Sequence, residues 1–190
     1  ITNQDRVESE GNLDKKRETR HSKPAIGLGL DTVEDGDQSL IFTMTRASSV
    51  AAATEAGKFV AEQLKKDELE KLLKISKTIL PKETEDQTKL VKKLADAVKN
   101  GAAFHHAGLD QRCRTIIETE FKNGHIKLLA STPTLAAGVN LPARRVIISS
   151  VFRFGPNGNA PISILEYKQM CGRAGRPQYD DEGESIIVAK

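Results

Sequence analysis

Two arginines in residues 167–177, which read YKQMCGRAGRP, form the pattern in this chain with the most specific chemistry. Arg173 and Arg176 lie three residues apart and each follows a glycine, so two rigid guanidinium groups stand on neighbouring, uncrowded backbone. Such groups bind phosphate oxygens bidentately, keep their charge, and can stabilise negative charge on a transferred phosphoryl group. The alternative is a surface turn in which the arginines form salt bridges with the acidic residues at 180, 181 or 182.

A second chemical candidate is the pair His105 and His106, with Cys113 nearby. Consecutive histidines on a strand point to opposite faces, and no matching second pair of ligands is present. The sequence therefore predicts no metal site.

Composition limits the class of protein. The chain has 190 residues, of which 38% are hydrophobic and 29% charged, as expected of one soluble domain that needs neither disulfides nor metal to fold. Two cysteines suit a reducing compartment, and neither a signal-like start nor an apolar stretch long enough to cross a bilayer is visible. We therefore expect a cytoplasmic protein, or a nuclear one in a eukaryote, with no membrane partner.

The net charge of +3 is weak evidence for an anionic partner. Residues 58–99 contain 11 basic and 8 acidic side chains, which accounts for the whole excess. This stretch has the pattern of a solvated helical surface. Tryptophan is absent and aromatics make up only 4%, which disfavours a surface built on base stacking.

Strand and helix patterns must position these residues, and they alternate along the chain. The pattern predicts strands over residues 25–33, 40–45, 102–106, 127–132, 145–151 and 185–189. It predicts helices over residues 47–64, 68–81, 90–98 and 165–173, and a short helical turn after Pro133. Another predicted helix has Asp110 as its N-cap, a buried face from Cys113 to Phe121, and Gly124 beyond its end. This alternation predicts an α/β fold with a mainly parallel sheet covered by helices on both faces. Ligands of such sheets bind beyond the carboxyl ends of the strands.

The two ends of this arrangement differ from its centre. Residues 1–24 are polar, and we expect a poorly ordered N-terminal segment there, followed by one domain over residues 25–190. Residues 150–164 read SVFRFGPNGNAPISI and predict a β-hairpin that leaves the sheet. Phe152 and Phe154 lie two apart, so they face the same side of a strand and either pack on the domain or protrude.

Four segments, in order, resemble motifs of superfamily 2 helicases. QMCGRAGRP at 169–177 resembles motif VI, STPTLAAGVNLPA at 131–143 resembles motif V, AFHHAGL at 103–109 resembles the motif before it, and LIFTMTRAS at 40–48 resembles motif IV. The chain is most similar to the second RecA-like domain of the Ski-like group, and within it to the archaeal DNA helicases that act at stalled replication forks, whose human relatives work in DNA repair. The resemblance is weakest over residues 65–99.

The resemblance implies roles for individual residues. The catalytic set it implies is Arg173 and Arg176, which reach the γ-phosphate of ATP across a cleft between two lobes, with Gln169 beside them. The nucleotide-binding set is Gly138, Asn140 and Gly172, and the set that contacts the nucleic-acid backbone is Thr45, Arg46, His106, Thr132 and Thr134. Phe152 and Phe154 would form a strand-separating wedge, and His105 is left for packing.

Each role has a structural alternative. Asn140 also suits a tight turn that enters the strand at Arg145, and Thr45 and Arg46 also suit the exposed start of a helix.

Two motifs of a complete motor are missing from the sequence. It contains neither a G-x-x-x-x-G-K-[ST] loop for phosphates nor an acidic box for Mg²⁺. ATP and Mg²⁺ would therefore both require the first RecA-like domain as a partner, and we expect this chain alone to hydrolyse no ATP.

Three functions follow from these observations. The favoured one is a lobe of an ATP-dependent 3′–5′ DNA helicase that grips single-stranded or forked DNA. A Ski-like RNA helicase lobe is an alternative, since HHAG and GRAGRP occur in both branches. A non-catalytic nucleic-acid-binding module is another.

Overall fold

Buried apolar strands form the centre of the molecule. The computed structural model describes residues 21–81, 88–135, 139–155, 158–176 and 180–188, and this part of the chain forms a five-stranded parallel sheet. In sheet order the strands are β2 (Ala102–His105), β3 (Leu128–Ser131), β1 (Ser39–Phe42), β4 (Arg145–Ile148) and β7 (Glu184–Ile187). Every residue of the first four is buried, as expected of a parallel sheet covered on both faces.

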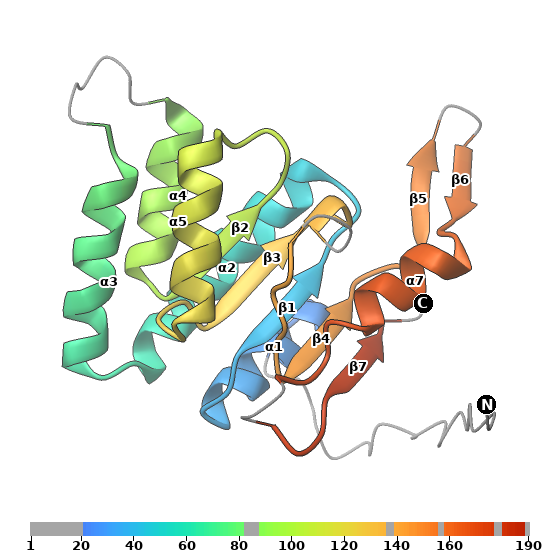
Figure 1. Ribbon diagram of the computed structural model, residues 1–190, viewed down its shortest axis with the longest axis horizontal. Coiled ribbons are helices and arrows are strands. Elements are labelled where there is room, and N and C mark those ends of the chain that lie inside the picture. The colour runs from blue at the N-terminus through green and yellow to red at the C-terminus, as the bar shows by residue number, and fades with distance from the viewer. Residues whose placement is uncertain (1–20, 82–87, 136–138, 156–157, 177–179, 189–190) are drawn as a thin grey trace.

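Helices cover both faces of this sheet (Figure 1). One layer contains α1 (Pro24–Glu34), which packs on β1 and β4, and α2 (Arg46–Gln63), which packs on β2 and β3. Helices α3 (Lys66–Ile79) and α4 (Lys89–Lys99) pack on each other, and α4 also contacts α2 and β2. The opposite layer contains α5 (Gln111–Lys122) and α7 (Ile164–Cys171). The predicted α/β fold is confirmed.

Local signals set the helix boundaries. The carboxylate of Asp110 accepts a hydrogen bond from the backbone N–H of Cys113, which makes Asp110 the N-cap that the sequence predicted for α5. Gly101 has a φ of +82° directly after α4, a backbone conformation that favours glycine. The predicted and observed ends of the other helices and strands differ by up to three residues, as is common.

The prediction of a strand over residues 25–33 is wrong, because this segment is helix α1. The alternation of Ile26, Leu28 and Leu30 indicated one buried strand face, yet seven of the eleven residues of α1 are buried, glycines included. A Cβ atom at Gly29 would lie 3.0 Å from Leu128 and 3.1 Å from Ile41. Gly29, which would weaken a strand, therefore lets α1 lie close to the sheet.

The predicted hairpin is confirmed. Strands β5 (Phe152–Gly155) and β6 (Gly158–Pro161) pair antiparallel, with Phe152 opposite Pro161 and Gly155 opposite Gly158. Figure 1 shows the hairpin standing away from the main sheet, above the start of α7.

Some sequence-based expectations fall outside the described residues. These include the order of residues 1–20, Gly138, and most of the helical turn after Pro133, of which Thr134 and Leu135 have helical backbone. His21 and Lys23, just before α1, contact Glu55 of α2. Among the helices that the structure describes, none has the length and apolar character needed to cross a membrane.

Candidate nucleotide and nucleic-acid interfaces

The loops that follow β1, β2 and β3 meet in a groove of about 480 Å³ at the carboxyl edge of the sheet. Four predicted site residues line it: Arg46, Thr132 and Thr134 from the set that contacts nucleic acid, and Gln169 from the catalytic set. The other lining residues are Met44, Ala107, Pro133, Arg153, Ser163, Leu165 and Glu166. The structure thus brings segments about 120 residues apart in sequence into one groove where ligands of parallel sheets bind.

The two threonines of this groove are preorganised. The hydroxyls of Thr132 and Thr134 lie 2.9 Å apart within hydrogen-bonding distance, and the backbone N–H of Thr132 donates to the carbonyl of His105. Thr132 is buried, whereas Thr134 is exposed. A hydroxyl held in this way can donate to a phosphate oxygen without first being ordered.

Thr45 and Arg46 have different roles at the start of α2. The Thr45 hydroxyl accepts a hydrogen bond from the backbone N–H of Ser48 at 3.0 Å, and the Ser48 hydroxyl accepts one from the backbone N–H of Thr45. This capping box fixes the start of α2 and occupies the Thr45 side chain. Arg46 is exposed at that start and lines the groove, so the geometry favours Arg46 over Thr45 as a phosphate contact.

His105 ends β2 and His106 follows it, and both side chains are buried. Nε2 of His105 lies 2.8 Å from a carboxylate oxygen of Glu118, and burial nevertheless lowers the pKa of His105. His106 accepts a hydrogen bond from the backbone N–H of Gly108 and stacks on Phe104 with ring centroids 5.6 Å apart. Burial lowers the pKa of His106, and the charge of Arg46 lowers it further. The lowered pKa disfavours a second positive charge on His106 beside Arg46.

The sequence did not point to Arg153 or Glu166, which extend the groove toward the hairpin. Their side chains form a salt bridge between β5 and α7. The only sequence signal was a charged residue between two phenylalanines on a predicted hairpin. This bridge attaches the hairpin to the helix that carries Gln169.

Phe152 is 53% exposed on the hairpin, which disfavours the interpretation that it packs in the core. The side chain of Phe154 lies outside the described part of the structure. Ile164 and Leu165 at the start of α7 are 76% and 68% exposed. The hairpin and the start of α7 thus present apolar side chains beyond the sheet.

Arg173 lies where the segment after α7 pairs with the segment before β4. The backbone N–H of Ala143 donates to the carbonyl of Arg173, and the N–H of Gly175 donates to the carbonyl of Ala143. Nη1 of Arg173 donates to Oδ1 of Asn140 at 2.8 Å. Two residues predicted to serve the nucleotide, Arg173 and Asn140, are therefore in direct contact, and Gly172 precedes them at the end of α7.

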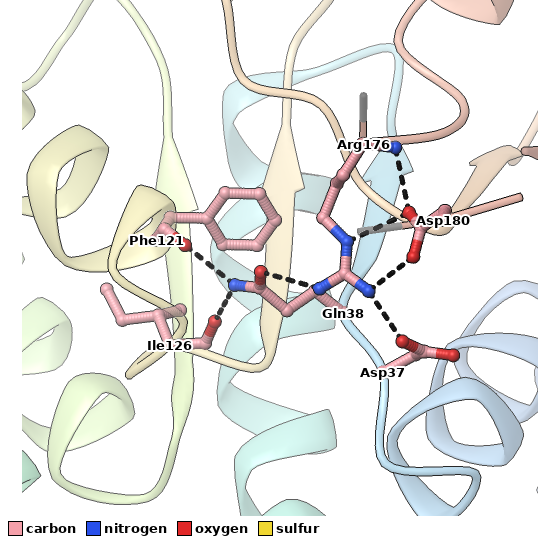
Figure 2. Close-up of polar contacts among 6 residues, drawn as sticks. All are labelled: Asp37, Gln38, Phe121, Ile126, Arg176 and Asp180. Atoms are coloured by element: carbon pink, nitrogen blue, oxygen red, sulfur yellow. Dashed lines mark hydrogen bonds and ion pairs between the residues drawn. The ribbon is translucent and has the colours of Figure 1, made fainter. Parts of the chain in front are cut away.

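Arg176 lies deeper, at the amino end of β1 (Figure 2). Its Nε and Nη2 donate to the two oxygens of Asp180 at 2.9 and 2.6 Å, Nη2 donates to Asp37 at 2.6 Å, and Nη1 donates to Gln38 at 3.3 Å. Hydrogen bonds from Arg176 lower the pKa of Asp180, and the charge of Arg144 lowers it further. The salt-bridge alternative raised by the sequence is thus present for Arg176.

Gln38 connects this network to the opposite helix layer. Its Nε2 donates to the carbonyls of Phe121 and Ile126 at 2.7 Å each, and its side-chain oxygen faces Arg176. Gln38 is buried, so its amide group depends on these partners.

The predicted site residues therefore form two sets. The first set meets in the groove at the carboxyl edge and contains Arg46, Thr132, Thr134 and Gln169. In the second set, Arg173 pairs with Asn140 where the segment after α7 meets the segment before β4. Gln169 lines the groove about one helical turn before Arg173. Among the described residues, no group of three or more histidine, cysteine or acidic side chains is suited to hold a metal ion.

Comparison with known proteins identifies the family. Residues 60–178 match the model of the helicase conserved C-terminal domain. The chain belongs to this helicase C-terminal domain family. Membership confirms the predicted likeness to the second lobe of superfamily 2 helicases, and the matched region contains the segments resembling motifs V and VI.

Several archaeal helicases are similar over most of the chain. The ATP-dependent DNA helicase Hel308 of Methanocella arvoryzae is 45% identical over 179 residues, which is 93% of this chain and 24% of that protein. The Hel308 of Caldivirga maquilingensis is 40% identical over 176 residues, 92% of this chain and 23% of that protein. The Hel308 of Pyrococcus horikoshii is 42% identical over 162 residues, 85% of this chain and 22% of that protein. The chain spans about a quarter of the length of these curated relatives.

Proposed function

We propose that this chain is the second motor lobe of an ATP-dependent DNA helicase that moves 3′ to 5′. The observation that supports this most is the groove in which Arg46, Thr132 and Thr134 meet beside α7, whose end leads directly to Arg173. In this proposal the lobe grips DNA at one place and contacts nucleotide at another. The polarity rests on the family resemblance alone.

Nucleic acid would bind along the groove through its backbone. Arg46 offers a charged donor to phosphate oxygens, and the threonine pair offers one free hydroxyl hydrogen, because the other is used in the bond between the two hydroxyls. None of these donors reads a base. Such contacts are independent of sequence and weaken as salt rises. The favoured substrate is therefore single-stranded or forked DNA.

The nucleotide would meet Arg173, Asn140 and the glycine before Arg173. Arg173 supplies a planar cation that stabilises charge on the transferred phosphoryl group, and Asn140 orients that cation. Arg176 would join only after leaving its carboxylate partners. Mg²⁺ and the phosphate-binding loop would come from a first RecA-like domain, because the described part of this chain offers no cluster of metal ligands.

The hairpin would separate the strands. Phe152 would stack on the base exposed when the last pair opens, a contact worth about 1–3 kcal/mol per base. We further propose that the protein works where its DNA is, in the cytoplasm or, in a eukaryote, the nucleus.

The alternative functions are less well supported. The relatives that cover most of the chain are named DNA helicases, which disfavours an RNA substrate. The segment QMCGRAGRP keeps both arginines and both glycines, which disfavours a non-catalytic module.

Arg173→Ala in the full-length protein tests the proposal. We expect DNA-stimulated ATP hydrolysis to fall roughly 10³-fold or more, the loss typical of an arginine finger, while affinity for single-stranded DNA stays within about twofold. Lys168→Ala removes the same charge from an exposed site one turn earlier on α7 and should leave hydrolysis unchanged. Normal hydrolysis in Arg173→Ala would refute the nucleotide assignment.

A further inference from the structure

We propose that Asp180 and Asp37 are positioning residues that hold Arg176 withdrawn, so that a nucleotide phosphate must displace both carboxylates before Arg176 can bind it. This inference rests on the proposed function. It concerns how the second arginine of the GRAGR segment becomes available.

The first step is the number of donors on the guanidinium. An arginine side chain has five N–H groups. Arg176 uses four of them, one on Nε, two on Nη2 and one on Nη1. Bidentate recognition of phosphate needs two parallel N–H groups on one edge of the guanidinium. Counting only contacts among the described residues, one N–H is left, so phosphate can engage Arg176 fully only by replacing an existing partner.

The second step identifies which carboxylate binds Arg176 more strongly. Asp180 accepts from the backbone N–H of Arg176 as well as from Nε and Nη2, and its side chain is only 3% exposed. Asp37 contributes one contact and is 33% exposed. A buried, bidentate, charge-assisted pair is far stronger than a partly solvated single contact. Asp180 is therefore the main restraint and Asp37 the lesser one.

The third step concerns the surroundings of Asp180, Asp37 and Gln38 when Arg176 moves away. Arg144 lies near enough to lower the pKa of Asp180 by its charge, so Asp180 keeps a cationic neighbour when Arg176 leaves. Asp37 is exposed enough to be hydrated. Gln38 keeps both carbonyl partners of its amide nitrogen and loses only the longest contact, at 3.3 Å. Release therefore costs the buried Gln38 oxygen its contact with Arg176, whereas Asp180 keeps the backbone N–H of Arg176 and the charge of Arg144 nearby.

Asp180→Asn in the full-length helicase is the principal test. The amide retains an oxygen for the backbone N–H of Arg176 but loses the charge that holds its side chain. We expect affinity for a non-hydrolysable ATP analogue to rise about three- to tenfold and the KM for ATP to fall by a similar factor, with kcat unchanged or higher. Asp37→Asn should act in the same direction by a smaller factor. Asp181→Asn, at an exposed neighbouring carboxylate, is the matched control and should change neither.

The double variant Asp180→Asn with Arg176→Ala shows whether the effect passes through Arg176. We expect it to bind the ATP analogue like Arg176→Ala alone. A lower kcat with unchanged KM in Asp180→Asn would mean that the carboxylate orients Arg176 for catalysis, and would overturn the proposal. A change in ATP affinity that persists without Arg176 would also overturn it.

These outcomes are distinct from failure of the proposed function, which is read from Arg173→Ala. If Asp180→Asn does not fold, Asp37→Asn carries the test, because its contact is peripheral. Unaltered ATP affinity in a folded Asp37→Asn protein would then overturn the proposal.

Discussion

Arg145 is a buried cation that joins three elements, and its replacement gives a sharp test of the fold. Its Nε donates to Glu184 of β7 at 2.5 Å, and its Nη1 donates to the hydroxyl of Thr32 at 2.8 Å and to the carbonyl of Leu28 at 3.3 Å, both on α1. Arg145 itself begins β4 and is 9% exposed. The residue thus fastens α1 and the edge strand to the centre of the sheet.

Arg145→Met keeps the apolar stem and removes the charge and the donors. The contact with the Thr32 hydroxyl is worth about 1.5 kcal/mol, and the long contact with Leu28 adds less. The pair with Glu184 adds only about 0.5–1 kcal/mol, because that carboxylate is nearly half exposed and is hydrated when left alone. Thr32 still donates to the Leu28 carbonyl at 2.8 Å, so no buried polar group is stranded. We expect a loss of about 2–3 kcal/mol in the free energy of unfolding.

Urea denaturation of the 190-residue chain, followed by circular dichroism, measures this loss, and the melting temperature should fall by about 5–10 °C. Glu184→Gln is the matched control and should cost at most about 1 kcal/mol. A loss below about 0.5 kcal/mol in Arg145→Met, or equal losses in the two variants, would refute the view that the contacts with α1 dominate.

Three further predictions test the hairpin, the isolated lobe and the core. Changing Phe152 and Phe154 to Ala should impair duplex unwinding by the full-length protein while DNA-stimulated ATP hydrolysis survives, and Phe59→Ala, at another exposed phenylalanine, should spare both; a joint loss of unwinding, hydrolysis and thermal stability would assign the pair to packing. The 190-residue chain alone should show no ATP hydrolysis above background and weak binding to single-stranded DNA that falls as salt rises; salt-insensitive binding would contradict a backbone grip. Burial and the neighbouring Asp110 raise the pKa of Cys113 to about 12. At pH 8 a thiol reagent should therefore modify Cys171 in the native chain and both cysteines only in denaturant. Rapid labelling of two native thiols would contradict the buried position of Cys113.

The strands were predictable because burial and chain geometry act locally. Runs such as LIF in β1 and RVII in β4 are β-prone, short and bounded by polar or turn residues, so the sequence indicated both their place and their parallel pairing. The hairpin followed from the Gly-Pro-Asn-Gly-Asn turn. Helix α1 was not predictable from its pattern, since Gly27 and Gly29 disfavour both helix and strand in isolation. Close packing on Leu128 and Ile41 decided its conformation.

The candidate site was predictable in its members but not in its contacts. The spacing of Arg173 and Arg176 within one motif identified both, and the acidic residue at 180 was recognised as a possible partner. Asp37 lies 139 residues from Arg176, so no local pattern joins them. Their contact depends on the loop after α7 returning to the amino end of β1, which is a property of the strand order. The difference between Arg173, which is paired with Asn140, and Arg176, which is held by two carboxylates, therefore appears only in three dimensions.

Helix α7 is the element that connects the two sets of site residues. Gln169 in its last turn lines the groove at the carboxyl edge, and Arg173 follows four residues later, about 6 Å along the helix direction, in contact with Asn140. Met170 between them is fully buried against the core, and the Arg153–Glu166 bridge holds the hairpin to the same helix. These eight residues of one helix therefore contact the groove and the hairpin and lead directly to Arg173. In the proposed motor, we expect α7 to couple the nucleotide contact to the gripped strand, because a shift of one short helix moves all three connections together.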